Sequence, residues 1–182
     1  MLLPEYRFDY LSDGHVDLWF KKDPLFTDDI KNIYLDAITD SGYTYTIRKK
    51  RRNAEVRIRE KDNPMKTNPN VQGYVQWKSY GARVVTDLRN PLSLTNRNFN
   101  DFITSHEVGH VLGLAHRFDT PVSDTVMNYP RITDLSNGNA ATRLTESDLN
   151  NTRNFHKAIT NEDFDPLTGV HYCTAGCSHF ID

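Results

Sequence analysis

The sequence lacks the features that mark several specialised classes of protein. Its 182 residues contain no internal repeat and no Pro-, Gly- or Ser-rich stretch that would divide the chain, so we expect a single domain over 1–182. No apolar run approaches the ~18 residues that a membrane-spanning helix needs, and Met1 to Tyr10 carries charges where a signal peptide would be apolar. The formal net charge of −2 gives no general attraction for nucleic acid. These absences argue against a membrane span and leave nucleic-acid binding unsupported.

Two local clusters leave alternatives open. The five consecutive basic residues from Arg48 to Arg52 have no interleaved aromatic residues, which favours a solvated surface over a nucleic-acid site. Cys173 and Cys177 are the only cysteines, and their spacing fits a local disulfide or a reduced pair. Together with His171 and His179 they would also supply the donors of a second metal site. The sequence is compatible both with a cytosolic protein and with a mature exported one.

Hydrophobic periodicity predicts strands first and helices later, with one early helix. Thr27 is a suitable N-cap for the early helix, and Ser41 and Gly42 are suitable residues to end it. A short connection before Ala82 makes the last two strands a hairpin. This order favours an α+β domain with a mixed, mostly parallel five-stranded sheet and one antiparallel edge strand. We predict strands at 15–20, 43–48, 54–59, 74–77 and 82–88, later helices from about residue 100 and at 146–156, a core over about 10–156, and an irregular extension over 157–182.

One segment, HEVGHVLGLAH, carries the strongest functional pattern. On a helix, His106 and His110 lie one turn apart on the same face, so both imidazoles can reach one metal ion. Glu107 lies about 100° around the helix, which suits a carboxylate that contacts a metal-bound water rather than the metal. Gly113 can adopt the positive φ that ends the helix and brings His116 round as a third ligand. Three protein nitrogens leave a fourth position for water, as in catalytic zinc sites, and the alternative is a closed structural site.

The same segment fits the pattern HExxHxxGxxH, and in this respect the sequence resembles the metzincin metallopeptidases. The run from Thr125 to Tyr129 follows it, and by resemblance Met127 forms a hydrophobic base beneath the metal. The spacing is most similar to that of matrixins, in which an aspartate at the position of Asp148 anchors the methionine turn. The resemblance implies a zincin-like fold, with a twisted sheet, a backing helix, an active-site helix and a C-terminal helix.

The sequence departs from the matrixin pattern at several positions. Arg117 stands where matrixins usually have serine, and the Met-x-Tyr pattern is closer to astacins and serralysins. In those families the tyrosine approaches the metal, so Tyr129 is a secondary catalytic candidate, with a packed turn residue as the alternative. The matrixin loop ligands for structural zinc and calcium are not recognisable between Lys61 and Tyr80. No cysteine-containing pro-segment is recognisable either, so we expect no latency device in this chain.

Motif and resemblance together predict a zinc-dependent endopeptidase. The three histidines would hold Zn²⁺, and Glu107 would act as general base. An extended protein or peptide substrate would pair with an edge strand within Gly73 to Lys78, beside a pocket walled by Pro130 to Leu135. The resemblance also implies secretion, and we expect a monomer. The rival hypotheses are an inactive zinc-binding protein on the same scaffold, a zinc enzyme acting on a small-molecule amide, and a nucleic-acid-binding module.

Overall fold

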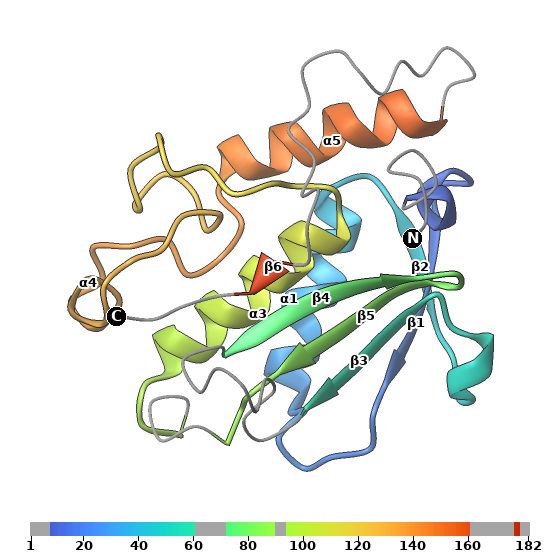
Figure 1. Ribbon diagram of the computed structural model, residues 1–182, viewed down its shortest axis with the longest axis horizontal. Helices are drawn as coiled ribbons and strands as arrows, with labels where there is room; N and C mark the ends of the chain where they lie inside the picture. Colours follow the sequence, from blue (N-terminus) through green and yellow to red (C-terminus); the bar gives the residue numbers. More distant parts are fainter. Residues whose placement is uncertain (1–7, 61–71, 90–93, 161–176, 179–182) are drawn as a thin grey trace.

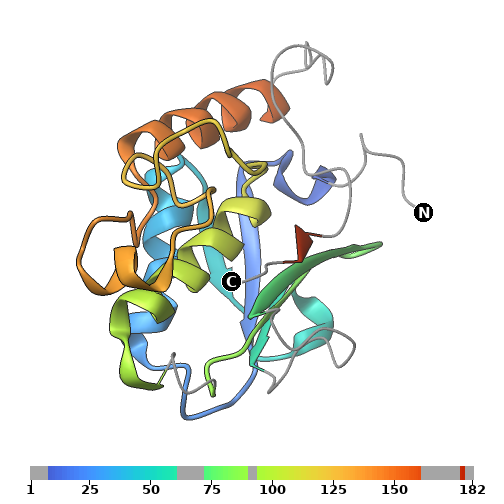
Figure 2. The same cartoon turned by 60° about the vertical axis from the view of Figure 1, so that its left-hand side comes forward.

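The computed structural model describes residues 8–60, 72–89, 94–160 and 177–178. A twisted sheet forms one layer of the protein, and the long helices lie together on one face of this sheet (Figure 1, Figure 2). Within these ranges, no helix combines the length and apolar character that crossing a bilayer requires. The strands are β1 (His15–Phe20), β2 (Thr44–Ile47), β3 (Val56–Glu60), β4 (Gly73–Lys78), β5 (Gly81–Thr86) and β6 (Cys177–Ser178); the helices are α1 (Asp28–Asp40), α3 (Arg97–Val111), α4 (Ile132–Ser136) and α5 (Glu146–Thr160), with short 3-10 helices η2 (Asp9–Leu11) and η3 (Arg51–Asn53).

The sheet is mixed and mostly parallel, as the sequence predicts. Its strand order is β2-β1-β3-β5-β4-β6. Neighbours among β1, β2, β3 and β5 pair in parallel, whereas β4 pairs antiparallel with β5 through a tight hairpin. The coarse α+β class and the expected antiparallel pair are therefore confirmed.

The C-terminal region departs from the prediction that 157–182 is irregular. Helix α5 continues to Thr160, because residues 157–160 contain no Gly or Pro that would end it. Beyond it, the two-residue strand β6 pairs antiparallel with β4, so the sheet has a sixth strand and β4 is not its outermost member. A strand this short has no periodicity of its own, and only its distant partner defines it.

The main core holds α3 against the sheet. Thr27 begins α1 as predicted, its hydroxyl accepting the Ile30 N–H at 3.4 Å. Apolar side chains from the central strands meet the apolar faces of α1 and α3, and their burial fixes α3 relative to β4 and β5. Representative members are Val16, Leu18, Val56, Ile58 and Val84 from the strands, and Ile33, Ile38, Val108 and Val111 from the helices.

A second core lies between α3 and the chain that follows it. Apolar residues from the first half of α3 pack against residues that come after the helix, and this contact ties the irregular segment to α3. Its members include Phe99, Phe102, Ile103, Leu114, Val126, Met127 and Leu135.

The basic run from Arg48 to Arg52 lies on the surface, as predicted. All five residues are exposed; residues 48–50 follow the end of β2, and Arg51 and Arg52 begin η3. The Arg48 guanidinium forms an ion pair with Asp17 at 2.7 Å. The run therefore belongs to the solvated end of an edge strand.

Candidate metal centre

Helix α3 supplies the first two histidines. His106 and His110 lie one turn apart on the last part of α3, and both are buried. Their Nε2 atoms are 3.1 Å apart. Glu107, also on α3, is completely buried. The expected helical placement of the HExxH segment is therefore confirmed.

The turn after α3 brings the third histidine to the first two. Gly113 has φ of 93°, and the Leu114 N–H donates to the Gly109 carbonyl at 2.9 Å, which closes the helix with a left-handed residue. The chain then reverses, and Nε2 of His116 comes within 3.3 Å of Nε2 of His106. The prediction that a positive φ at Gly113 redirects the chain is confirmed.

Gly113→Ala should destabilise the protein by about 2–4 kcal/mol, because the added Cβ is strained at this φ and also overpacks a core. The Cβ would lie 2.7 Å from the ring of Phe155. Gly138→Ala is a matched control, because Gly138 has φ of 72° and no atom within 4 Å of the added Cβ. Urea unfolding should show the larger loss at Gly113, and equal losses would contradict the proposed clash.

Two backbone carbonyls fix the tautomers of the helical histidines. Nδ1 of His106 lies 2.5 Å from the Val126 carbonyl oxygen, and Nδ1 of His110 lies 2.8 Å from that of Leu114. A carbonyl only accepts hydrogen bonds, so each Nδ1 must carry the proton. In the neutral ring Nε2 then presents a lone pair, which is the form that binds a metal.

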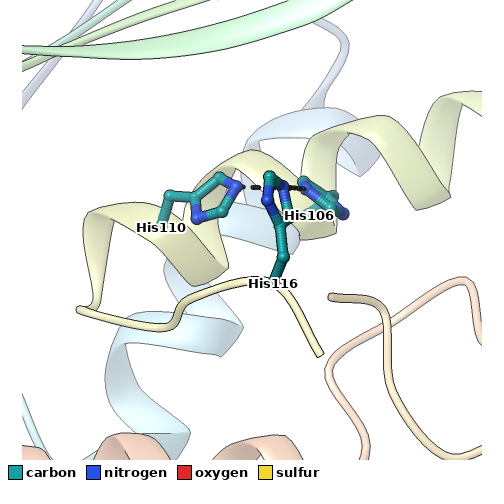
Figure 3. Close-up of side chains that lie close together, drawn as sticks. All are labelled: His106, His110 and His116. Carbon is teal, nitrogen blue, oxygen red and sulfur yellow. Dashed lines mark hydrogen bonds between the residues drawn. The ribbon is translucent and has the colours of Figure 1, made fainter. Parts of the chain in front are cut away.

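The spacing of the three Nε2 atoms fits a metal ion. Figure 3 shows the rings of His106, His110 and His116 pointing toward one another, with one ligand atom of each within 4.8 Å of the others. Nε2 of His106 lies 3.1 Å from that of His110 and 3.3 Å from that of His116. Ligands of tetrahedral zinc at about 2.0–2.1 Å are roughly 3.3 Å apart. The Nε2 lone pairs of His106 and His110 repel at this distance unless a cation lies between them. The three histidines can therefore hold a metal ion.

Met127 lies against the part of α3 that carries His106 and His110. It is completely buried, and a Cβ added to Gly109 would lie 2.6 Å from its Sδ atom. The methionine therefore packs against α3 at Gly109, the residue before His110. The preceding residue, Val126, provides the carbonyl that orients His106. The methionine turn thus packs against α3 at Gly109 and forms a hydrogen bond with His106.

Asp148 anchors the methionine turn, in agreement with the contact that the matrixin resemblance implies. Its buried carboxylate accepts hydrogen bonds from the Thr125 hydroxyl at 2.6 Å and the Val126 N–H at 3.1 Å. It also accepts from the Thr145 N–H at 3.2 Å, at the start of α5. One carboxylate therefore joins α5 to the turn that orients His106.

Tyr129 lies beside the histidines. Its hydroxyl is 3.0 Å from Nε2 of His116, and its ring stacks on His106 with centroids 5.9 Å apart. Burial raises the pKa of Tyr129, and the charge of Glu107 raises it further. The hydroxyl therefore keeps its proton at neutral pH and can donate a hydrogen bond beside the three histidines.

Strand β4 lies directly against Glu107, a contact that sequence reasoning missed. A Cβ added to Gly73 would overlap Oε1 of Glu107, so only glycine lets the backbone pass so close to the carboxylate. A glycine at the start of a predicted strand was the available signal. The contact places the backbone of β4 next to the candidate general base.

Two further predictions concern the surroundings of the centre. The segment Pro130 to Leu135, expected to wall a pocket, contributes α4 and buries Leu135 in the second core. His171, Cys173 and His179 lie outside the described residues, and only the backbone of Cys177 is described. The state of the two cysteines and the second metal site therefore stay predictions.

Comparison with known proteins does not assign the chain to a family. No protein-family model matches the chain, and a search of curated protein sequences finds no match. The likeness to metzincins therefore rests on the motif residues 106–129 and on the arrangement of their side chains.

Proposed function

We propose that this protein is a zinc-dependent endopeptidase. The observation that carries the proposal is that Nε2 of His106 lies 3.1 Å from that of His110 and 3.3 Å from that of His116. In addition, Nδ1 of His106 and Nδ1 of His110 each face a backbone carbonyl. A buried carboxylate, Glu107, follows the first of these histidines on the same helix. Imidazole donors suit zinc, and a set of three leaves a position for solvent.

Each group at the centre has a separate chemical task. Bound zinc would lower the pKa of a coordinated water toward ~7 and polarise the scissile carbonyl. Glu107 would take the proton from the attacking water at a carboxylate oxygen and deliver it to the leaving nitrogen. Tyr129 would donate a hydrogen bond to the oxygen on which negative charge develops. Met127 and Asp148 would hold the histidines without touching the substrate.

The position of β4 supports a polypeptide substrate over a small-molecule amide. Its backbone lies against Glu107 at Gly73. A peptide that pairs with the outer side of β4 would be held extended beside the carboxylate, and backbone pairing selects for an extended chain. Side-chain pockets would then set the cleavage preference.

Tyr129→Phe should lower kcat by about 10²-fold while leaving zinc content and KM nearly unchanged, because only the hydrogen-bond donor is lost. Tyr45→Phe is the matched control, since Tyr45 lies on β2 at the other edge of the sheet. Steady-state kinetics with a peptide substrate test both variants. An unchanged kcat for Tyr129→Phe would favour the alternative of a packed turn residue.

Cleavage of an internally quenched peptide library tests the proposed function. The zinc-loaded chain should cleave internal peptide bonds, a chelator should abolish cleavage, and added zinc should restore it. A zinc-loaded chain that cleaves no peptide would instead support the inactive zinc-binding protein. Cleavage of small acylated amines alone would support the small-molecule amidase.

A further inference from the structure

The strand that lies against the candidate general base already has a partner on its outer side. Strand β6 pairs antiparallel with β4, with Tyr74 opposite Ser178 and Val75 opposite Cys177. Figures 1 and 2 both show β6 beside β4, on the side away from β5. Gly73, which lies against the Glu107 carboxylate, directly precedes the two β4 residues that pair with β6. Adjacent strands are about 4.8 Å apart, so β6 lies next to the candidate active site.

The outer side of β4 can pair with only one strand at a time. Each backbone N–H and C=O that faces outward makes its ladder hydrogen bonds to one neighbouring chain. A substrate that pairs with Tyr74 and Val75 must therefore displace Cys177 and Ser178. We propose that residues 177–178 are an intramolecular occupant of the substrate edge, which competes with the substrate. This inference rests on the proposed function, and it replaces the expectation that the chain has no latency device.

Two features set how strongly β6 competes with a substrate: the size of its contact with β4, and the fact that β6 belongs to the same chain. Strand β6 forms two residue pairs with β4, whereas β5 forms six on the other side. The short contact is weak, so a longer peptide can replace it. Because 177–178 belong to the same chain, their pairing with β4 is intramolecular and does not depend on the protein concentration. The occupant should therefore raise KM for short substrates and leave kcat unchanged.

Proline substitution in the full chain tests the inference. Cys177→Pro combined with Ser178→Pro removes both backbone donors of β6. Cys177→Ala combined with Ser178→Ala is the matched control, because it also lacks the thiol and the hydroxyl but keeps both N–H groups. In the proline variant, the outer side of β4 should be open to substrate in a larger fraction of the molecules. Its KM for a short peptide should therefore be about tenfold below that of the control. Its kcat, zinc content and melting temperature should equal those of the control.

A second measurement removes the dependence on how the proline variant folds. A specific protease site is introduced between residues 160 and 177, and the folded, zinc-loaded chain is cut there before assay. Cutting should lower KM to the value of the proline variant. An equal KM before and after cutting, with peptides still hydrolysed, would overturn this inference alone, as would a fall in kcat with unchanged KM. If no form hydrolyses peptides, the proposed function fails and the inference fails with it.

Discussion

Glu107→Gln should lower kcat/KM for peptide hydrolysis by about 10²–10⁴-fold while the protein keeps its zinc. Glutamine has nearly the same shape as glutamate, so the packing against Gly73 is preserved. It cannot accept the proton of the attacking water or return it to the leaving nitrogen. Metal analysis and steady-state kinetics on the same preparation separate the loss of chemistry from the loss of metal.

The control for this variant is Glu146→Gln. Glu146 lies at the exposed start of α5, where its carboxylate pairs with Arg153 at 2.7 Å. An exposed ion pair contributes little stability, so this variant should hydrolyse peptides at the normal rate. If Glu107→Gln retained full activity with zinc bound, the role assigned to Glu107 would be wrong.

Asp148→Ala should cost about 3–5 kcal/mol of folding free energy, because two buried and two partly buried hydrogen bonds to a charged acceptor disappear together. The groups left without this acceptor are the hydroxyls of Thr125 and Thr145 and the N–H groups of Val126 and Thr145. The loss is a large part of the 5–15 kcal/mol that stabilises a typical domain. Urea unfolding of the zinc-free protein measures it without a contribution from metal binding.

The same substitution should also weaken zinc binding by about 10–100-fold. The Val126 carbonyl orients His106, and Asp148 holds the Val126 backbone in place. Asp134→Ala is the matched control, because Asp134 accepts the Arg131 N–H at the start of α4 rather than an N–H of the methionine turn. That variant should lose about 1 kcal/mol and bind zinc normally. Equal zinc affinity in the two variants would contradict the anchoring role of Asp148.

Local signals in the sequence were sufficient for most of the fold. The early helix is fixed by its cap at Thr27 and by the stop at Gly42, which has φ of 94°. Strand β1 was predicted with its observed bounds. The alternation of apolar and polar residues was less informative for β2. It suggests a buried face that includes Tyr45 and Ile47, but these side chains are 36% and 49% exposed. Position at the edge of the sheet, which is a property of the whole fold, decides that exposure.

The elements that escaped prediction are those that depend on distant partners. Helix α4 has five residues, and it is held by Leu135 in the second core and by the bond between Arg131 and Asp134. Strand β6 has two residues and exists only through pairing with β4. Neither segment is long enough for an apolar period to appear in the sequence.

Some features of the candidate site could be predicted from the sequence, and others could not. The spacing of the histidines and the freedom of Gly113 predicted which side chains would meet. The carbonyls of Val126 and Leu114, which fix the helical tautomers, could not be named from sequence because any residue supplies a carbonyl. The approach of Gly73 to Glu107 likewise depends on how β4 crosses α3.

X-ray absorption at the zinc edge of the zinc-loaded chain tests the central claim most directly. We expect three imidazole nitrogens and one additional light atom, all at about 2.0–2.1 Å, with one imidazole lost in His116→Ala. A shell at about 2.3 Å would indicate cysteine sulfur in the zinc site. That result, or a fourth imidazole in place of the light atom, would contradict an open centre built from His106, His110 and His116.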